Sequence, residues 1–321
     1  MRMKVREYRK YVKPLAWRDG PQDLYPGKLH WMEGGTDMEG ISLCFAFYYV
    51  NERQTFHPME GMISHPYDEV LVFASLDRAN IRNLGGSVSI ALGSEDKVYE
   101  FDKPTVVCIP RGLPHGPVRV LSCEKPFVHY ALSLTGTYAE ERVDQDRRSD
   151  TDYAYLLKDF VFATSDEDKS EMGYAMALGP DGVAHPADAG VGPGNADSLL
   201  WMFGSDLENF EVNFTWGHYS RCGKWHRSGE AQTHPEEEAI FFVGLNPDDP
   251  FDFEAEIEQA LGPDGERYVI GSPSVYCIPP NLQHLPVVVR WVDKPYGLVV
   301  VGLARDHASE WSMSVEEALH I

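Results

Sequence analysis

The strongest constraint on this chain of 321 residues is that it repeats itself. Residues 45–134 align without a gap on residues 214–303 at a constant offset of 169, and 24 of the 90 aligned positions are identical. Chance would give roughly a quarter of that number at ordinary composition. The densest match pairs VVCIPRGLPHGPVRV (106–120) with VYCIPPNLQHLPVVV (275–289). A chain with this pattern is expected to fold as two copies of one structural unit.

Each copy has the pattern of β-structure. Alternation in FAFYYV (45–50) places Phe45 and Phe47 on one face of a predicted strand. The runs EVLVFASL (69–76) and EAIFFVGL (238–245) are short and apolar, which is typical of buried strands. Pro and Gly separate the runs. Many short strands at close spacing predict a sandwich or a barrel in each copy.

Few helices are predicted. SDTDYAYLLKDFVF (149–162) has a capping residue before an apolar stripe and predicts a helix that bridges the copies. SVEEALHI (314–321) has the pattern of a capping box and predicts a helix at the C-terminus. The stretch 163–197 is rich in Gly, Asp and Pro and predicts a long connection. We therefore predict an N-terminal domain over 1–148 and a C-terminal domain over 149–321.

Composition limits the partners of the chain. Lys plus Arg number 28 and Asp plus Glu 50, a net charge of −22, and such a surface repels nucleic acids and anionic membranes. The N-terminus lacks the apolar run of a signal peptide. The five cysteines are scattered and form no CxxC, so neither a disulfide framework nor a zinc ribbon is indicated. We expect a cytoplasmic protein that binds a small molecule, and a homo-oligomer remains open.

Histidine and glutamate survive where the charged residues around them have changed between the copies. His65 and Glu69 are four residues apart, so a strand would place both on one face. His234 and Glu238 repeat this arrangement. Inside a barrel, an imidazole and a carboxylate are costly unless they are paired or bind a metal. A buried hydrogen-bonded network without metal is the alternative.

A further histidine follows in each copy. His115 ends PRGLPH and His284 ends PPNLQH, about forty-five residues after the first pair of residues in each copy. The turn residues before them, Pro followed by Gly or Asn, deliver the histidine from a different strand. Each copy therefore offers two histidines and one glutamate that can meet.

At these residues the sequence resembles the cupin superfamily. That family has a first motif H-x-H-x3-4-E and a second motif containing P-x-G-x2-H. The second histidine and the glutamate of the first motif and the histidine of the second motif occur in this order in both copies, although Asn281 replaces the glycine of the second motif in the second copy. The resemblance implies an all-β fold of two tandem cupin barrels (a double-stranded β-helix, or jelly roll) with short helical additions and a metal site in each. It implies the following metal ligands: His65, Glu69 and His115 in the first copy, and His234, Glu238 and His284 in the second.

The first histidine of the family motif is missing. Its position holds Ile63 in the first copy and Gln232 in the second. His57 and His226 lie eight residues before the second histidine of the motif in both copies, and a loop can return either of them to the metal. We predict that at least one of them completes a shell of three histidines and one glutamate. The alternative is a structural histidine that anchors a turn.

Several other residues are interpreted as ordinary core or surface residues. They are His129, His185, His218, His307, Cys108 and Cys277. Of these, His218 is a candidate for a place inside a barrel.

The resemblance implies a metal-dependent enzyme, in which we can name no general base. Two histidines and one carboxylate leave coordination positions open, which is the ligand logic of non-haem Fe(II) oxygenases. Mn, Ni, Co and Zn accept the same ligands. The leading hypothesis is an Fe(II) dioxygenase-type oxidoreductase that acts on a small cyclic or carboxylated molecule. A non-catalytic bicupin that binds a metal or a small molecule, and a sugar-type isomerase, are the alternatives.

Overall fold

The computed structural model describes residues 6–143, 150–160, 196–224, 231–308 and 310–311, and two short strands between 177 and 185. The chain divides into two compact units. The first barrel contains the described residues of Leu15–Val161 together with Asp206–Phe210. The second barrel contains the described residues of Met1–Pro14, Phe162–Ser205 and Glu211–Ile321.

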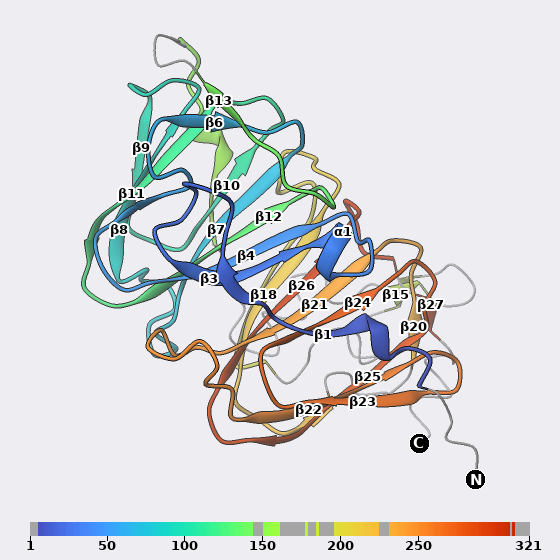
Figure 1. The fold of residues 1–321 in the computed structure, drawn as a ribbon. Helices are drawn as coiled ribbons and strands as arrows, with labels where there is room; N and C mark the ends of the chain where they lie inside the picture. Colours follow the sequence, from blue (N-terminus) through green and yellow to red (C-terminus); the bar gives the residue numbers. More distant parts are fainter. Residues whose placement is uncertain are drawn as a thin grey trace. The chain divides into compact units, whose positions relative to one another are not determined.

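The first barrel consists of two antiparallel sheets (Figure 1). The seven-stranded sheet has the order β14 (Leu157–Asp159), β10 (Thr105–Ile109), β7 (Glu69–Ser75), β12 (Phe127–Ser133), β4 (Cys44–Val50), β3 (Lys28–Glu33), β2 (Trp17–Asp19). The six-stranded sheet has the order β13 (Glu141–Val143), β6 (Met62–Ser64), β11 (His115–Cys123), β8 (Gly86–Leu92), β9 (Val98–Phe101), with β5 (Thr55–Phe56) beside β11. The helical additions are α1 (Gly34–Asp37) and the 3-10 turn η2 (Ala154–Leu156).

The second barrel repeats this plan. One sheet has the order β1 (Val12–Pro14), β24 (Ser274–Ile278), β21 (Glu238–Val243), β26 (Tyr296–Gly302), β18 (Asn213–Tyr219), β17 (Ser198–Met202). The other has the order β16 (Ala184–His185), β15 (Ala177–Leu178), β27 (Glu310–Trp311), β20 (Gln232–Thr233), β25 (His284–Val292), β22 (Ala255–Leu261), β23 (Glu266–Ile270), with β19 (Gly223–Lys224) beside β25. The 3-10 turn η1 (Arg9–Tyr11) precedes β1.

The strand registers of the two barrels correspond residue by residue. Glu69 lies opposite Ile109 in the pair β7–β10, and Glu238 lies opposite Ile278 in the pair β21–β24. Every residue of β4, β7 and β12 is buried, as is every residue of β18 and β21. The prediction of an all-β fold with two tandem barrels and short helical additions is therefore confirmed. Within the described part of the chain, no helix is long and apolar enough to span a bilayer.

The helix predicted over 149–162 is wrong for the residues that the structure describes, 150–160. Only the single turn η2 is helical, and Leu157–Asp159 then pair with Thr105–Val107 as an edge strand. Backbone pairing to an open sheet edge overrides the helical pattern here. The helix predicted over 314–321 lies outside the described residues, as does most of the predicted connection over 163–197.

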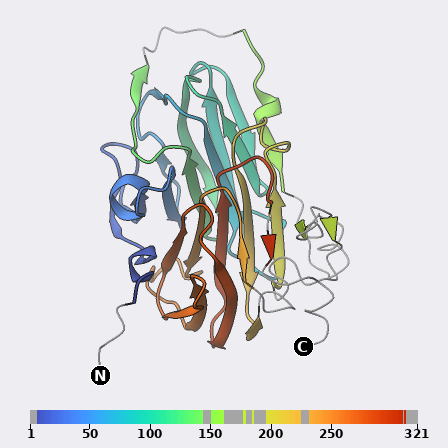
Figure 2. The ribbon, with the colours of Figure 1, turned by 90° about the vertical axis from the view of Figure 1, so that its right-hand side faces the viewer.

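The predicted boundary between residues 148 and 149 stays a prediction, because 144–149 also lie outside the described residues. In the described residues, each barrel nevertheless includes one strand from the other side of this boundary. β14, which follows residue 148, pairs with β10 of the first barrel, and β1 near the N-terminus pairs with β24 of the second barrel. In Figures 1 and 2 the dark blue N-terminal segment runs beside the orange strands of that barrel.

Tyr8 fixes the N-terminal segment to the second barrel through close packing and a hydrogen bond. The amide of Tyr8 donates to the hydroxyl of Tyr268 at 3.0 Å, and the ring of Tyr8 covers Gly262 in the turn between β22 and β23. A Cβ at Gly262 would come within 2.1 Å of this ring. Gly265 in the same turn also has a positive φ, but open space surrounds it.

These two glycines allow a matched test of how Tyr8 packs. Gly265→Ala should lower the free energy of unfolding by about 1 kcal/mol, because only the positive φ opposes the new side chain. Gly262→Ala should cost at least about 1 kcal/mol more, because the Tyr8 ring must also move. Urea unfolding of the two variants compares the costs. Equal costs would show that Tyr8 does not occupy this place.

Candidate metal centres

The first barrel brings four predicted residues together. The ligand atoms of His57, His65, Glu69 and His115 all lie within 4.8 Å of one another, and all four residues are buried. The Nε2 atoms of these histidines, in that order, lie 2.9, 3.4 and 3.6 Å from Oε2 of Glu69. Glu69 begins β7 and His115 begins β11, whereas His65 follows β6, so three different strands supply the cluster.

The second barrel forms a cluster of three residues. His234, Glu238 and His284 are buried, and their ligand atoms also lie within 4.8 Å of one another. The two Nε2 atoms lie 3.4 and 3.3 Å from Oε2 of Glu238. Gln232 occupies the position of the missing first histidine, and its amide nitrogen lies 3.1 Å from Nε2 of His284. His226 lies outside the described residues, so its predicted role stays a prediction.

Backbone carbonyls orient the rings of both clusters. Nδ1 of His65 donates to the carbonyl of Ala139 at 2.8 Å, and Nδ1 of His115 donates to that of Leu113 at 3.0 Å. In the second barrel the same bonds run from His234 to Glu236 at 3.0 Å and from His284 to Leu282 at 2.9 Å. With the proton on Nδ1, each Nε2 presents a lone pair to the centre of the cluster, which is the form that binds a metal.

The centres of both clusters contain buried polar atoms without hydrogen-bond partners. They are Nε2 of His65, His115 and His234, and Oε2 of Glu238. A metal-free network would pair such atoms, because a buried acceptor without a partner costs about 1–3 kcal/mol. Such facing atoms are stabilised by a positive charge between them, which a proton on an imidazole or a metal ion can supply. Both clusters can therefore hold a divalent metal ion.

The protonation states also suit a metal. Burial raises the pKa of Glu69, but His65 and His57 outweigh it and hold the pKa well below its ordinary value. Burial also raises the pKa of Glu238, but His234 outweighs it and holds this pKa well below its ordinary value. Burial, together with His65, lowers the pKa of His115 to about 3. Ionised carboxylates and a neutral imidazole are the ligand forms of these side chains. Burial lowers the pKa of His65 and of His234, but Glu69 and Glu238 outweigh it and raise both, that of His234 to about 9, so these two rings release a proton when a metal binds.

Solved structures resemble the fold. No protein-family model and no curated protein matches the chain. A point mutant of oxalate decarboxylase from Bacillus subtilis is 10% identical, with a TM-score of 0.56, over 97% of this chain and 80% of that one. A structure from work on the Mn(II) centres of the same enzyme gives the same values. A third, from work on its substrate binding and reaction specificity, is 11% identical, with a TM-score of 0.54 and the same coverage.

The chain has the bicupin fold. At such low identity the likeness concerns the fold alone. The geometry of the two clusters therefore carries the rest of the argument about this bicupin.

In the first barrel, His57 joins the cluster although the first histidine of the motif is missing. It has a positive φ of 51°, which is strained for a residue with a side chain and is found where a site requires it. Gly116 of β11 packs against its carbonyl, where a Cβ would come within 2.4 Å. Nδ1 of His57 meets the hydroxyl of Tyr25 at 3.2 Å, and that hydroxyl meets Nε2 of His129 at 3.1 Å. His129 is thus a core residue, as predicted, that also supports the His57 side chain through Tyr25.

The remaining ligand atom of Glu69 is also bound. Ser133 donates to Oε1 of Glu69 at 2.6 Å from the opposing position on β12. The corresponding position opposite Glu238 is Gly302, which has no side chain to donate. Among the described residues, Glu69 therefore has a side-chain partner on β12 that Glu238 lacks on β26.

The sequence interpretation missed His307. Its ring lies 5.6 Å from that of His234, and Nδ1 lies 3.6 Å from Oε1 of Glu236. His307 lies 169 residues after Tyr138, just beyond the aligned window, and a histidine paired with a tyrosine gives no signal at that offset. His218, in contrast, is buried away from the cluster and bonds Ser198 at 2.8 Å.

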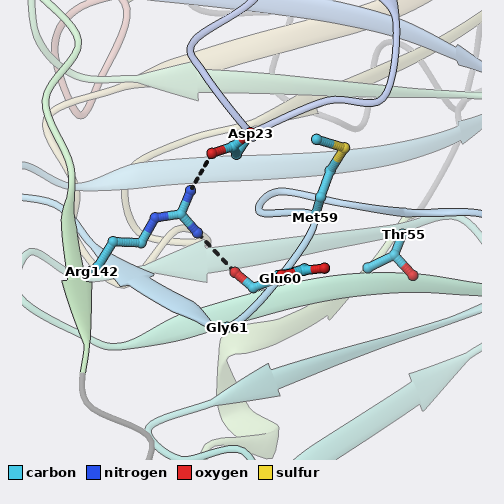
Figure 3. A pocket seen from close by; sticks show the side chains of 6 residues that line it. All are labelled: Asp23, Thr55, Met59, Glu60, Gly61 and Arg142. Carbon is cyan, nitrogen blue, oxygen red and sulfur yellow. Dashed lines mark hydrogen bonds and ion pairs between the residues drawn. The ribbon is translucent and has the colours of Figure 1, made fainter.

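A pocket of about 650 Å³ opens beside the His57 loop in the first barrel (Figure 3). It is lined by Asp23, Thr55, Met59, Glu60, Gly61 and Arg142. Arg142 of β13 donates to the carbonyl of Glu60 at 2.8 Å and lies 4.0 Å from the carboxylate of Asp23. No metal ligand lines this pocket. Arg142 is thus engaged by Asp23 and by the backbone of Glu60, and its bond to Glu60 holds the loop that follows His57.

The first cluster predicts that His57 is a ligand. His57→Ala should weaken metal binding in the first barrel by at least the ten- to hundredfold that follows the loss of outer-shell partners. Elemental analysis after dialysis against a weak chelator should then show that one of the two metal equivalents is lost first. Equal retention in the variant and the parent protein would assign His57 to turn anchoring.

The Tyr25 hydroxyl should matter because it positions His57. Tyr25→Phe should weaken metal binding in the first barrel by up to about tenfold, measured by competition with a chromophoric chelator. Tyr48→Phe is the matched control, since Tyr48 packs on Tyr25 but its hydroxyl donates to Gln54 at 2.8 Å. A loss of affinity in both variants would indicate a packing effect and would contradict the role given to the Tyr25 hydroxyl.

Proposed function

We propose that this bicupin is a divalent-metal-dependent enzyme of the Fe(II) dioxygenase type that acts on a small molecule with oxygen donors. The observation that carries the proposal is the convergence of unpartnered Nε2 atoms on a carboxylate inside each barrel. A storage or sensing protein would need the same ligands, but it would not need open coordination positions.

The second barrel suits this chemistry better. Two histidines and one carboxylate form a set that leaves one side of a metal open, as in non-haem Fe(II) oxygenases. A metal bound there supplies a Lewis acid and open positions for the oxygen atoms of a substrate and for a second reactant. His234, Glu238 and His284 hold the site. Their burial keeps bulk water out and strengthens every polar contact within it.

The first barrel favours a second candidate, a Mn(II)-dependent decarboxylase. Its cluster has three histidines and one glutamate, and the fold resembles that of oxalate decarboxylase, for which Mn(II) centres are described. Manganese accepts these ligands as readily as iron. The two candidates differ in what is consumed, because only a dioxygenase consumes oxygen in step with its substrate.

Oxygen uptake separates the candidates. The protein is loaded with Fe(II) or Mn(II) and given catechol, small hydroxy acids and oxalate, while oxygen and carbon dioxide are measured. We expect uptake of oxygen by the Fe(II) form, and a loss of at least about a hundredfold in Glu238→Gln, which removes a charged ligand. Glu256→Gln is the control, because that glutamate is exposed in the same barrel.

Other outcomes identify the alternatives. Carbon dioxide release without net oxygen uptake, lost in Glu69→Gln, would favour the decarboxylase. Turnover of a sugar without oxygen would favour an isomerase. Metal uptake without turnover of any substrate would favour a binding protein and would contradict the proposal.

A further inference from the structure

Beside each cluster, two side chains occupy corresponding places, and we call them the wall pair. In the first barrel the wall pair is Tyr67 and Tyr138, and in the second it is Glu236 and His307, each 169 residues later. Three of these four side chains have rings, and each ring lies beside a histidine of its cluster. Tyr67 and Tyr138 lie 5.0 and 5.3 Å from the ring of His65, and His307 lies 5.6 Å from that of His234.

The surroundings of the wall pairs also correspond. The amide of Ala139 donates to the hydroxyl of Tyr67 at 3.1 Å. The amide of Ala308, the residue at the same offset, hydrogen-bonds the carboxylate of Glu236. Trp31 packs edge-on against Tyr138 at 5.4 Å, and Trp201 packs edge-on against His307 at 5.4 Å. The neighbouring tryptophan and backbone amide are therefore similar in the two barrels, whereas the side chains of the wall pair differ.

The wall pair of the first barrel is satisfied. The hydroxyl of Tyr67 donates to the carbonyl of Ala139 at 2.8 Å, and that of Tyr138 donates to Glu140 at 2.8 Å. Two phenol rings with bound hydroxyls, beside a cluster of four ligands, leave few polar groups for a further ligand.

The wall pair of the second barrel contains a hydrogen-bond acceptor, Oε1 of Glu236, without a partner among the described residues. Glu236 is only 8% exposed, and within the described part of the chain its Oε1 has no hydrogen-bond partner. Nδ1 of His307 is near this atom, at 3.6 Å, but too far for a hydrogen bond. A buried carboxylate oxygen in this state is satisfied by a donor that enters the site. Among the residues that the structure describes, the cluster beside it has three members, against four in the first barrel.

We propose that the second barrel takes the substrate, and that Glu236, next to His307, accepts a hydrogen bond from a hydroxyl of a small chelating molecule whose oxygens bind the metal. This inference rests on the proposed function and names its substrate class, a molecule of the α-hydroxy acid type. The hydroxyl that binds the metal donates its proton to Oε1 of Glu236. An ether at the same position offers no such proton.

A matched pair of ligands tests the inference without turnover. Glycolate and methoxyacetate both chelate through a carboxylate and a second oxygen, but only glycolate has a hydroxyl. The protein is loaded with Co(II) under anaerobic conditions, and the visible d–d absorption follows the binding of each ligand. We expect the parent protein to prefer glycolate, and Glu236→Gln to reduce this preference about tenfold, the effect of one hydrogen bond to a charged group.

Two further variants complete the design. His307→Phe keeps the ring against Trp201 but removes its nitrogens, and it should also reduce the preference, so that it decides the matter if Glu236→Gln does not fold. Tyr67→Phe changes the corresponding place in the first barrel and should leave the preference unchanged. Cobalt content and circular dichroism are measured for every variant.

The outcomes distinguish this inference from the proposed function. A protein that takes up no cobalt would overturn both. Cobalt uptake without a preference for glycolate would overturn the inference alone, because the metal centre would remain. A preference that survives in the folded variants of Glu236 and His307, or that is lost in Tyr67→Phe, would also overturn it.

Discussion

Both centres depend on one constraint, which is that ring nitrogens of histidines face a buried carboxylate in the middle of each cluster. Backbone carbonyls bind Nδ1 of His65 and His115, and carbonyls do the same for His234 and His284. The Nε2 atoms then converge on a carboxylate that is buried in each barrel. Such an arrangement is unfavourable by itself and is held by the packed strands around it. A cation between these atoms stabilises the arrangement. Metal binding therefore offsets the unfavourable free energy of burying these polar side chains.

The duplication shows which contacts this constraint requires and which it leaves free. Both barrels keep the strand registers that place Glu69 and Glu238. The surrounding polar groups differ, since Ser133 bonds Glu69 whereas Gly302 stands opposite Glu238. Position 129 holds a histidine that supports His57 through Tyr25, but the corresponding position is Leu298. The first barrel therefore has side-chain contacts that hold Glu69 and His57, and the second has no such contact at positions 302 and 298.

The sequence predicted the strands and most residues of the two clusters because both leave a local signal. Alternation and apolar runs mark strands such as 69–76, and the spacing of His65 and Glu69 puts both on one face. The return of His57 to the cluster followed from its retention in both copies. The helix over 149–162 was wrong, because its pattern cannot reveal an open sheet edge elsewhere in the chain. His307 was missed because its neighbours are made by the fold and not by sequence distance.

The strands that complete the two barrels show why a repeat cannot give the whole boundary of a domain. β10 and β24 are buried along their whole length, so their outer edges need a partner strand. β14 and β1 supply it, as Leu157–Lys158–Asp159 and Val12–Lys13–Pro14, one from after its own repeat and one from the N-terminus. They pair through the backbone, which places little demand on side chains, and the central lysine of each discourages a further strand. β14 and β1 therefore occupy equivalent edge positions in the two sheets, although their sequences do not align.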